Sequence, residues 1–264
     1  MHSNADGRAM GMKDVLRAAV ERSTGLRVMR QPPFGLDKYA DIKLVLAGHP
    51  MRTLIDIGAN VGQTARELRK AWPDAEIHCC EPVPTTFNAL KAAVGGDART
   101  HCHPVAIGAR HETLEMHLAQ GGDRSDISSL HAGHPALDGA RITHIPVQVI
   151  PLTELFEQQG ITHADLLKID TEGHDLAVLD GAAPLLASGR IGLVDVEVGM
   201  NRDNTFHVPL GLMQQRLEDL GYRLFGIYDQ MQEWPTKRPV LRRCNAVFIP
   251  ERMAPPGSWS PFPQ

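Results

Sequence analysis

The sequence lacks the long apolar runs, cysteine pairs and dense basic stretches that mark three large classes of protein. No run of about 18 apolar residues occurs, so we expect no membrane partner. The four cysteines show no Cys-x-x-Cys spacing, which favours reduced thiols in a cytoplasmic protein. The polar stretch Met1 to Gly11 has no secretion-signal core. A net charge of −4 without a sustained Lys/Arg run argues against a nucleic-acid partner.

Two common phosphate-binding fingerprints are also missing from the most informative stretch, Leu54-Ile55-Asp56-Ile57-Gly58-Ala59-Asn60-Val61-Gly62. Asn60 stands where the dinucleotide fingerprint has glycine, and no Gly-Lys-Ser/Thr follows. Leu54, Ile55 and Ile57 nevertheless predict a buried strand, and the two glycines let backbone come close to a ligand. A nucleotide-like molecule across this strand end is the favoured interpretation, and a tight turn without a ligand is the alternative.

The order of the predicted elements indicates an α/β protein. From residue 53 strands alternate with helices, as in a mostly parallel sheet, and the third strand is predicted from Arg99 to Ile107. The chain ends in a predicted antiparallel hairpin of Tyr222 to Tyr228 and Asn245 to Ile249. We expect an N-terminal helical extension over residues 1–50, a main domain over 51–252 with a β insertion at about 112–150, and a flexible tail over 253–264. The extension would cover a sheet face, close the active site or make a homodimer contact.

Acidic residues follow two further predicted strands. Glu81 ends the strand after the glycine turn, where a carboxylate meets ribose hydroxyls in nucleotide-binding sheets. Lys168 and Asp170 share one face of a strand and need charged partners, because unpaired buried charge is costly. Asp195 and Glu197 on the adjacent strand are the expected partners, and a structural ion-pair network is the alternative to a catalytic one.

These segments together resemble the FkbM family of class I S-adenosylmethionine (SAM) methyltransferases. The resemblance covers about residues 53–200 and is carried by Asp56 to Gly62, Cys80-Glu81-Pro82, Leu167 to Gly173, Val178 to Ala182 and Val196-Glu197. It implies a Rossmann-like fold of seven strands, SAM as cofactor, and O-methylation of a hydroxyl on a sugar, polyketide or other secondary metabolite. His174-Asp175 stands where the family often has a second glutamate after Glu-Gly.

The expected site follows from these residues. The resemblance and the strand ends together predict cofactor binding by eight residues: Asp56, Gly58, Asn60, Gly62, Glu81, Ala106, Ser129 and Asp170. Three residues leave the fourth core strand toward the same edge and are the catalytic candidates: Asp170, Glu172 and His174. A base near the acceptor oxygen would assist methyl transfer, because a protonated alcohol is a poor nucleophile.

Several alternatives stay open at this point. Asp170 and Glu197, with Glu172 as a further candidate ligand, could instead hold a divalent metal such as Mg²⁺. A zinc site, which the missing paired spacing disfavours, is invited by five histidines: His101, His103, His131, His134 and His144. An N- or carboxyl-methyltransferase, a nicotinamide-dependent oxidoreductase and a non-catalytic SAM-binding protein are the competing functions. The small hydroxylated acceptor itself cannot be read from the sequence.

Overall fold

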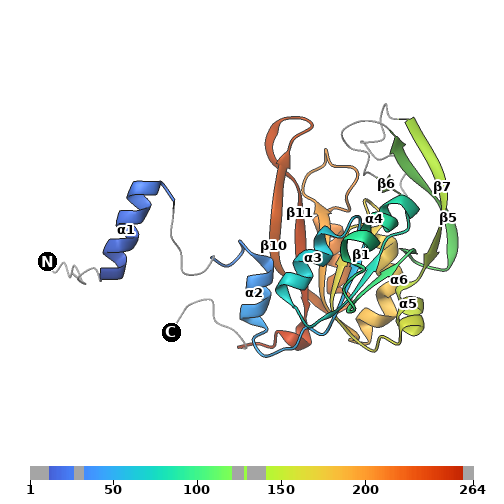
Figure 1. Ribbon diagram of the computed structural model, residues 1–264, viewed down its shortest axis with the longest axis horizontal. Coiled ribbons are helices and arrows are strands. Elements are labelled where there is room, and N and C mark those ends of the chain that lie inside the picture. Colours follow the sequence, from blue (N-terminus) through green and yellow to red (C-terminus); the bar gives the residue numbers. More distant parts are fainter. Residues whose placement is uncertain (1–11, 27–32, 121–127, 130–140, 258–264) are drawn as a thin grey trace.

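The computed structural model describes residues 12–26, 33–120, 128–129 and 141–257 (Figure 1). The expectations for the first eleven residues, for His131 and His134, and for the end of the tail from residue 258 lie outside these residues.

The centre of the protein is a seven-stranded sheet in the order β10-β11-β9-β8-β1-β2-β3. Five neighbouring strands are parallel, and β11 runs antiparallel to both β9 and β10, which confirms the predicted fold class. The bounds of the seven strands, in chain order, are β1 Thr53–Ile57, β2 Glu76–Cys80, β3 Thr100–His103, β8 Ala164–Ile169, β9 Ile191–Gly199, β10 Tyr222–Glu233 and β11 Arg238–Pro250. The last two strands are longer than predicted and form a protruding hairpin (Figure 1).

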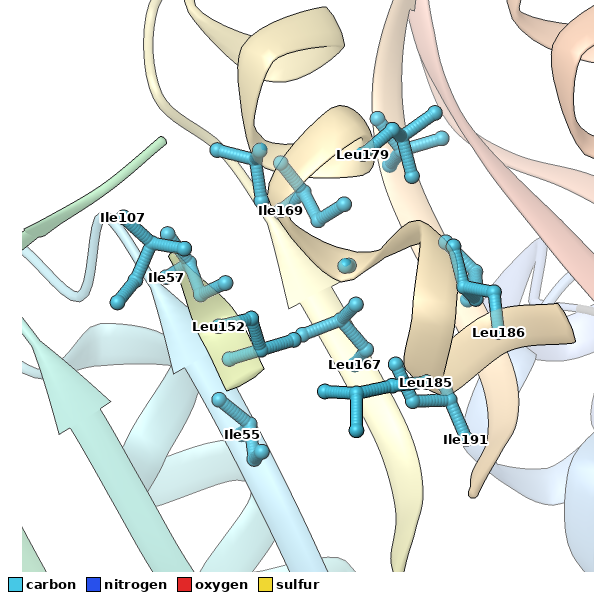
Figure 2. Packing of buried hydrophobic residues seen from close by; sticks show 14 of the residues in the cluster. Ile55, Ile57, Ile107, Leu152, Leu167, Ile169, Leu179, Leu185, Leu186 and Ile191 are labelled. Carbon is cyan, nitrogen blue, oxygen red and sulfur yellow. The ribbon is translucent and has the colours of Figure 1, made fainter. Parts of the chain in front are cut away.

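Helices cover both faces of this sheet. The covering helices are α2 Lys38–Val45, α3 Gln63–Ala71, α4 Pro84–Val94, α5 Leu152–Gln159, α6 Asp175–Ala187 and α7 Leu210–Glu218. A further helix, α1 Met12–Thr24, precedes them, and a 3-10 turn, Glu251–Met253, follows β11. Alternation along β1 sends Ile55 and Ile57 to the face packed by α5, α6 and α7, and sends Leu54 to the face packed by α2, α3 and α4. Figure 2 shows the first of these cores, where Leu179 and Leu185 of α6 lie against Leu167 and Ile169.

The two N-terminal helices behave differently. Asp37 caps α2 by accepting from the amides of Tyr39 and Ala40, and Ile42 is buried in the core. Of the three roles expected for this region, α2 therefore covers a sheet face. Helix α1 stands apart from the rest of the chain, and its apolar residues Met12 and Leu16 are exposed (Figure 1).

The β insertion is a second sheet in the order β4-β7-β5-β6. Its strands are β4 Ala106–Ile107, β5 Glu112–Gln120, β6 Ser128–Ser129 and β7 Arg141–Ile150. The expectation of one strand from Arg99 to Ile107 is wrong: β3 pairs in the main sheet, whereas β4 pairs with β7 in the second. Pro104 lies at the break, and because proline has no N–H group it cannot continue the ladder.

Among the residues that the structure describes, no helix is both long and apolar enough to cross a membrane.

The contact between α6 and the residue after β4 yields a stability prediction. A Cβ atom on Gly181 would lie 1.9 Å from the carbonyl oxygen of Gly108. Glycine to alanine inside a helix normally stabilises by about 1 kcal/mol, but here we expect Gly181→Ala to lower the free energy of unfolding by at least about 2 kcal/mol through overpacking. Gly211→Ala in α7, with no atom within 4 Å of the new Cβ, is the matched control. Urea unfolding measures both, and equal stability of the two variants would contradict the packing argument.

Candidate functional site

A cavity of about 280 Å³ opens at the carboxyl ends of β1, β2 and β8. Its lining residues come from the turn after β1, the start of α3, the end of β2, the segment around β4, one position of β5 and the turn after β8. They are Ile57, Gly58, Ala59, Asn60, Gln63, Thr64, Cys80, Glu81, Pro82, Val105, Ala106, Ile107, Met116, Asp170, Thr171, Glu172 and His174. A cavity at this edge is where open parallel sheets bind ligands.

The turn after β1 depends on backbone conformations that few side chains tolerate. Gly58 has φ of 81°, and Asn60, a residue type that accepts the left-handed region, has φ of 48°. A Cβ on Gly58 would lie 1.9 Å from the carbonyl oxygen of Asp170, so the ends of β1 and β8 approach as closely as glycine allows. Asp170 N in turn donates to the Ile57 carbonyl at 3.0 Å.

Glu81 joins this turn to the end of β2. Its Oε2 accepts from Asn60 N at 3.1 Å and its Oε1 accepts from Val83 N at 2.9 Å, while the residue is only 4% exposed. Burial raises the pKa of Glu81, and the two backbone donors offset part of that rise. Each oxygen keeps a lone pair, so the carboxylate can accept two hydroxyl donors from a ligand in the cavity.

The turn after β8 brings all three catalytic candidates to the cavity. Asp170, Glu172 and His174 line it, and Glu172 has a left-handed backbone with φ of 53°. Asp175 holds this turn, because its Oδ1 accepts from both the amide and the hydroxyl of Thr171, at 3.1 and 2.8 Å. Strain of this kind at a non-glycine residue is frequent at functional sites.

Behind Glu172 lies a buried cluster of Glu197, His207 and Asn204. Asn204 Oδ1 accepts from the amides of Phe206 and His207, and its Nδ2 donates to the Arg242 carbonyl. The same Nδ2 therefore faces His207 Nδ1 as a donor, at 2.9 Å. His207 Nδ1 also lies 3.1 Å from Asn204 Oδ1, and Nε2 lies 2.6 Å from Glu197 Oε2. Burial lowers the pKa of His207, which favours the neutral ring, and a proton on Nε2 would be donated to Glu197.

The side chains that could hold a metal ion differ from the expected set. Within the described part of the chain, one group of three ligand-type side chains gathers within 4.8 Å: Glu172, Glu197 and His207. Asp170 is not a member, so the structure does not bring together the expected pair of Asp170 and Glu197. Arg243 already contacts Glu197 Oε1, and His207 contacts its other oxygen.

The histidines expected as a zinc alternative lie elsewhere. His78, His101 and His103 stack along β2 and β3, with His78 Nδ1 3.1 Å from His103 Nε2. Burial and the neighbouring rings lower the pKa of His78 and of His103 to about 4, which keeps both neutral near pH 7. His144 lies on β7 opposite His117. None of these five lines the cavity.

Five of the eight expected cofactor residues line the cavity, namely Gly58, Asn60, Glu81, Ala106 and Asp170. The other three do not reach its described wall. Asp56 lies below the turn and is buried, with 1% of its surface exposed. A Cβ on Gly62 would contact Leu90 and Val94 of α4, so this glycine allows close helix packing. Ser129 belongs to β6, and its side chain lies outside the described part.

Of the two expected partners of Lys168, Asp195 interacts with it and Glu197 does not. Asp195 is its neighbour in register and raises the pKa of Lys168 electrostatically, but the ion pair of Asp195 is with Lys38 of α2, at 2.7 Å. Glu197 pairs with His207 and Arg243 instead. Lys168 Nζ lies 3.5 Å from Asp170 Oδ2 and donates to Asn245 Oδ1 at 3.2 Å.

Some lining residues were not expected from the sequence. Gln63 and Thr64 open α3 directly after the glycine turn, and their position at a helix start facing the strand ends is a signal that sequence reasoning could have used. Met116 reaches the cavity from β5 of the second sheet, and no local pattern marks it.

Comparison with known proteins gives matches to methyltransferases. The family model for the methyltransferase FkbM domain matches residues 56–224. Methyltransferase 1 of Beauveria bassiana is 24% identical over 142 residues, which are 48% of this chain and 57% of that protein. The 31-O-demethyl-FK506 methyltransferase FkbM of Streptomyces tacrolimicus is 25% identical over 159 residues, which are 50% of this chain and 60% of that protein. The matches thus span less than two thirds of the length of these curated relatives.

Comparison with solved structures gives matches of low similarity. A methyltransferase FkbM from Methylobacillus flagellatus KT has a TM-score of 0.49 and 13% identity, over 76% of this chain and 44% of that one. The METTL16 MTase domain has a TM-score of 0.46 and 13% identity, over 94% of this chain and 85% of that one. The family model itself covers more than half of the sequence, from the glycine turn to β10. The chain therefore belongs to the FkbM methyltransferase family.

Proposed function

We propose that this protein transfers the methyl group of SAM to a hydroxyl of a small, uncharged molecule, such as a sugar moiety, a polyketide or another secondary metabolite. The observation that carries the proposal is the single cavity wall shared by Glu81, the Gly58 turn and the acidic turn after β8. This combination offers one place for ribose hydroxyls and one for positive charge, with space for an acceptor between them and solvent.

The residues present fit SAM. Glu81 would accept the two ribose hydroxyls, and the apolar side chains of Val105, Ala106 and Ile107 provide a surface for the adenine. The Gly58 turn is a cradle that a Cβ atom would fill, so backbone can lie against the ligand. The side chain of Asp170 is 36% exposed. Its carboxylate would lie near the positively charged groups of SAM. When bound, SAM would supply a methyl group carried by its sulfonium sulfur, and loss of that methyl group turns the sulfonium into a neutral thioether.

Glu172 is the residue best placed to take the acceptor proton. It lines the cavity and its carboxylate also lies within 4.8 Å of Glu197 and His207, so it connects the open site to a buried hydrogen-bonded unit. The Glu172 carboxylate would accept the hydroxyl proton of the acceptor, to which SAM held by Glu81 and the Gly58 turn would supply the methyl group. Asp170 and His174 line the same wall and orient the acceptor, which supplies much of the rate enhancement in such displacements. The carboxylates of Asp170 and Glu172 disfavour an anionic acceptor.

The cofactor assignment is tested by ligand binding. We expect Glu81→Gln to weaken S-adenosylhomocysteine (SAH) binding about 10- to 100-fold, because hydrogen bonds to a charged group are worth about 1.5–3 kcal/mol. Glu76→Gln, at the opposite end of the same strand, makes the same charge change and should leave the dissociation constant unaltered. Calorimetry with SAM, SAH, NAD and NADP measures the affinities. Binding of NAD or NADP alone would overturn the proposal.

The base is tested by turnover. We expect Glu172→Gln to lower kcat about 10²- to 10⁴-fold, the usual contribution of a general base, with SAH affinity preserved. The assay uses SAM labelled in the methyl group with a panel of neutral sugars, hydroxylated polyketides, amines and carboxylates. Glu115→Gln on β5, outside the cavity lining, is the control. Labelled product with amines or carboxylates, and none with alcohols, would redirect the assignment to another acceptor atom.

Metal removal distinguishes the two roles open to the acidic cluster. We expect turnover to be unchanged after EDTA treatment, because Arg243 and His207 already occupy the oxygens of Glu197. Atomic absorption on the purified protein and the same labelled-methyl assay check this. Loss of turnover in EDTA that Mg²⁺ restores would instead assign Glu172, Glu197 and His207 as metal ligands.

A further inference from the structure

A row of buried charges crosses the sheet beneath the cavity. Asp56 on β1, Lys168 on β8 and Asp195 on β9 are consecutive register neighbours, so they share one face. Their exposures are 1%, 3% and 1%, and none of them lines the cavity. We call these three residues the charge row.

Helix α2 completes the charge row from outside the sheet. Lys38 Nζ lies 2.7 Å from Asp195 Oδ2 and 3.3 Å from Asp229 Oδ2, and the residue is only 8% exposed. Burial lowers the pKa of Lys38, but Asp195 and Asp229 raise it by more, so the ammonium stays charged. Asn245 links the two lysines indirectly, because it donates to Asp229, which contacts Lys38, and accepts from Lys168.

The charge row lies directly beneath the two segments that form the cavity floor. Asp56 immediately precedes Ile57 and Gly58, and Lys168 is followed two positions later by Asp170, whose Oδ2 is 3.5 Å from Lys168 Nζ. Lys168 is therefore the cation that Asp195 and Asp170 have in common. Asp195 Oδ1 and Asp56 Oδ2 are buried and have no hydrogen-bond partner among the described residues, which makes the row sensitive to any lost charge.

Removing Lys38 would redistribute this charge. Asp195 would keep Lys168 as its main cation, and Lys168 could satisfy it only by moving away from Asp170. The turn after β8 would then lose the ion pair that anchors Asp170 at the cavity. Lys38 and Asp229 both lie outside the segment that matches the family model, so the contact joins that segment to chain on either side.

We infer that Lys38 is a positioning residue of the cofactor site: by neutralising Asp195 it leaves Lys168 to Asp170, and docking of α2 and binding of the cofactor favour each other. The inference rests on the proposed SAM site. Because coupling between two sites is reciprocal, cofactor binding must also stabilise α2.

The variant test uses SAH as the probe and calorimetry as the readout. Lys38→Met should weaken SAH binding at least about tenfold, whereas Lys38→Arg should restore it to within about threefold of wild type. Adding Asp195→Asn to Lys38→Met removes both charges and should also restore affinity. Lys43→Met makes the same substitution on α2 and is the matched control, because Lys43 is exposed and contacts the Trp72 ring rather than the charge row. It should leave SAH affinity unchanged.

A second measurement needs no variant and decides the case if Lys38→Met fails to fold. Hydrogen exchange of the wild-type protein should slow in residues 38–45 on addition of SAH, by more than in α7 on the opposite face. Equal protection of α2 and α7, or Lys38→Met binding within twofold of wild type, would overturn the inference. Absence of SAH binding by the wild-type protein would instead overturn the proposed cofactor itself.

Discussion

The close approach of β1 and β8 is the constraint on which the site depends. With glycine at position 58, the turn lies against the Asp170 carbonyl, and the amide of Asp170 returns a hydrogen bond to Ile57. The same approach sets Asn60 where Glu81 can bind its amide. A side chain at position 58 would separate the two strand ends. The Glu81 carboxylate and the acidic turn would then no longer share one wall.

Sequence reasoning succeeded where the chemistry is local and failed where packing decides. The buried strand, the glycine turn and the acid at the end of β2 are readable because each follows from its own few residues. Gly62 is a glycine like Gly58, but it packs against α4. The position of α4 decides this role, and the local sequence does not reveal it. Pro104 lies between β3 and β4, and its residue type alone marks the end of a strand. The pairing of Asp195 with Lys38, across 157 positions, and the contact of Glu197 with His207 could not be read from any window.

The loop after β9 is held by residues of the β10–β11 hairpin that lie beyond the family match. Asn201 donates to Glu233, which forms a buried ion pair with Arg242, while Asn204 donates to the Arg242 carbonyl. The loop after β9 is thereby fastened to the β10–β11 hairpin at several points. A loop held in this way keeps His207 beside Glu172, so the hairpin contributes to the geometry of the acidic turn.

The division of the segment after β3 between two sheets has a consequence for how this protein could change. Ala106 and Ile107 form part of the cavity wall, yet they pair with β7 of the insertion and not with the main sheet. Met116 reaches the same wall from β5. The second sheet thus forms part of the cavity wall. A shorter homologue without the insertion would need another segment to enclose a ligand there. Exchange of this module between relatives would reshape the cavity while leaving the glycine turn and Glu81 untouched.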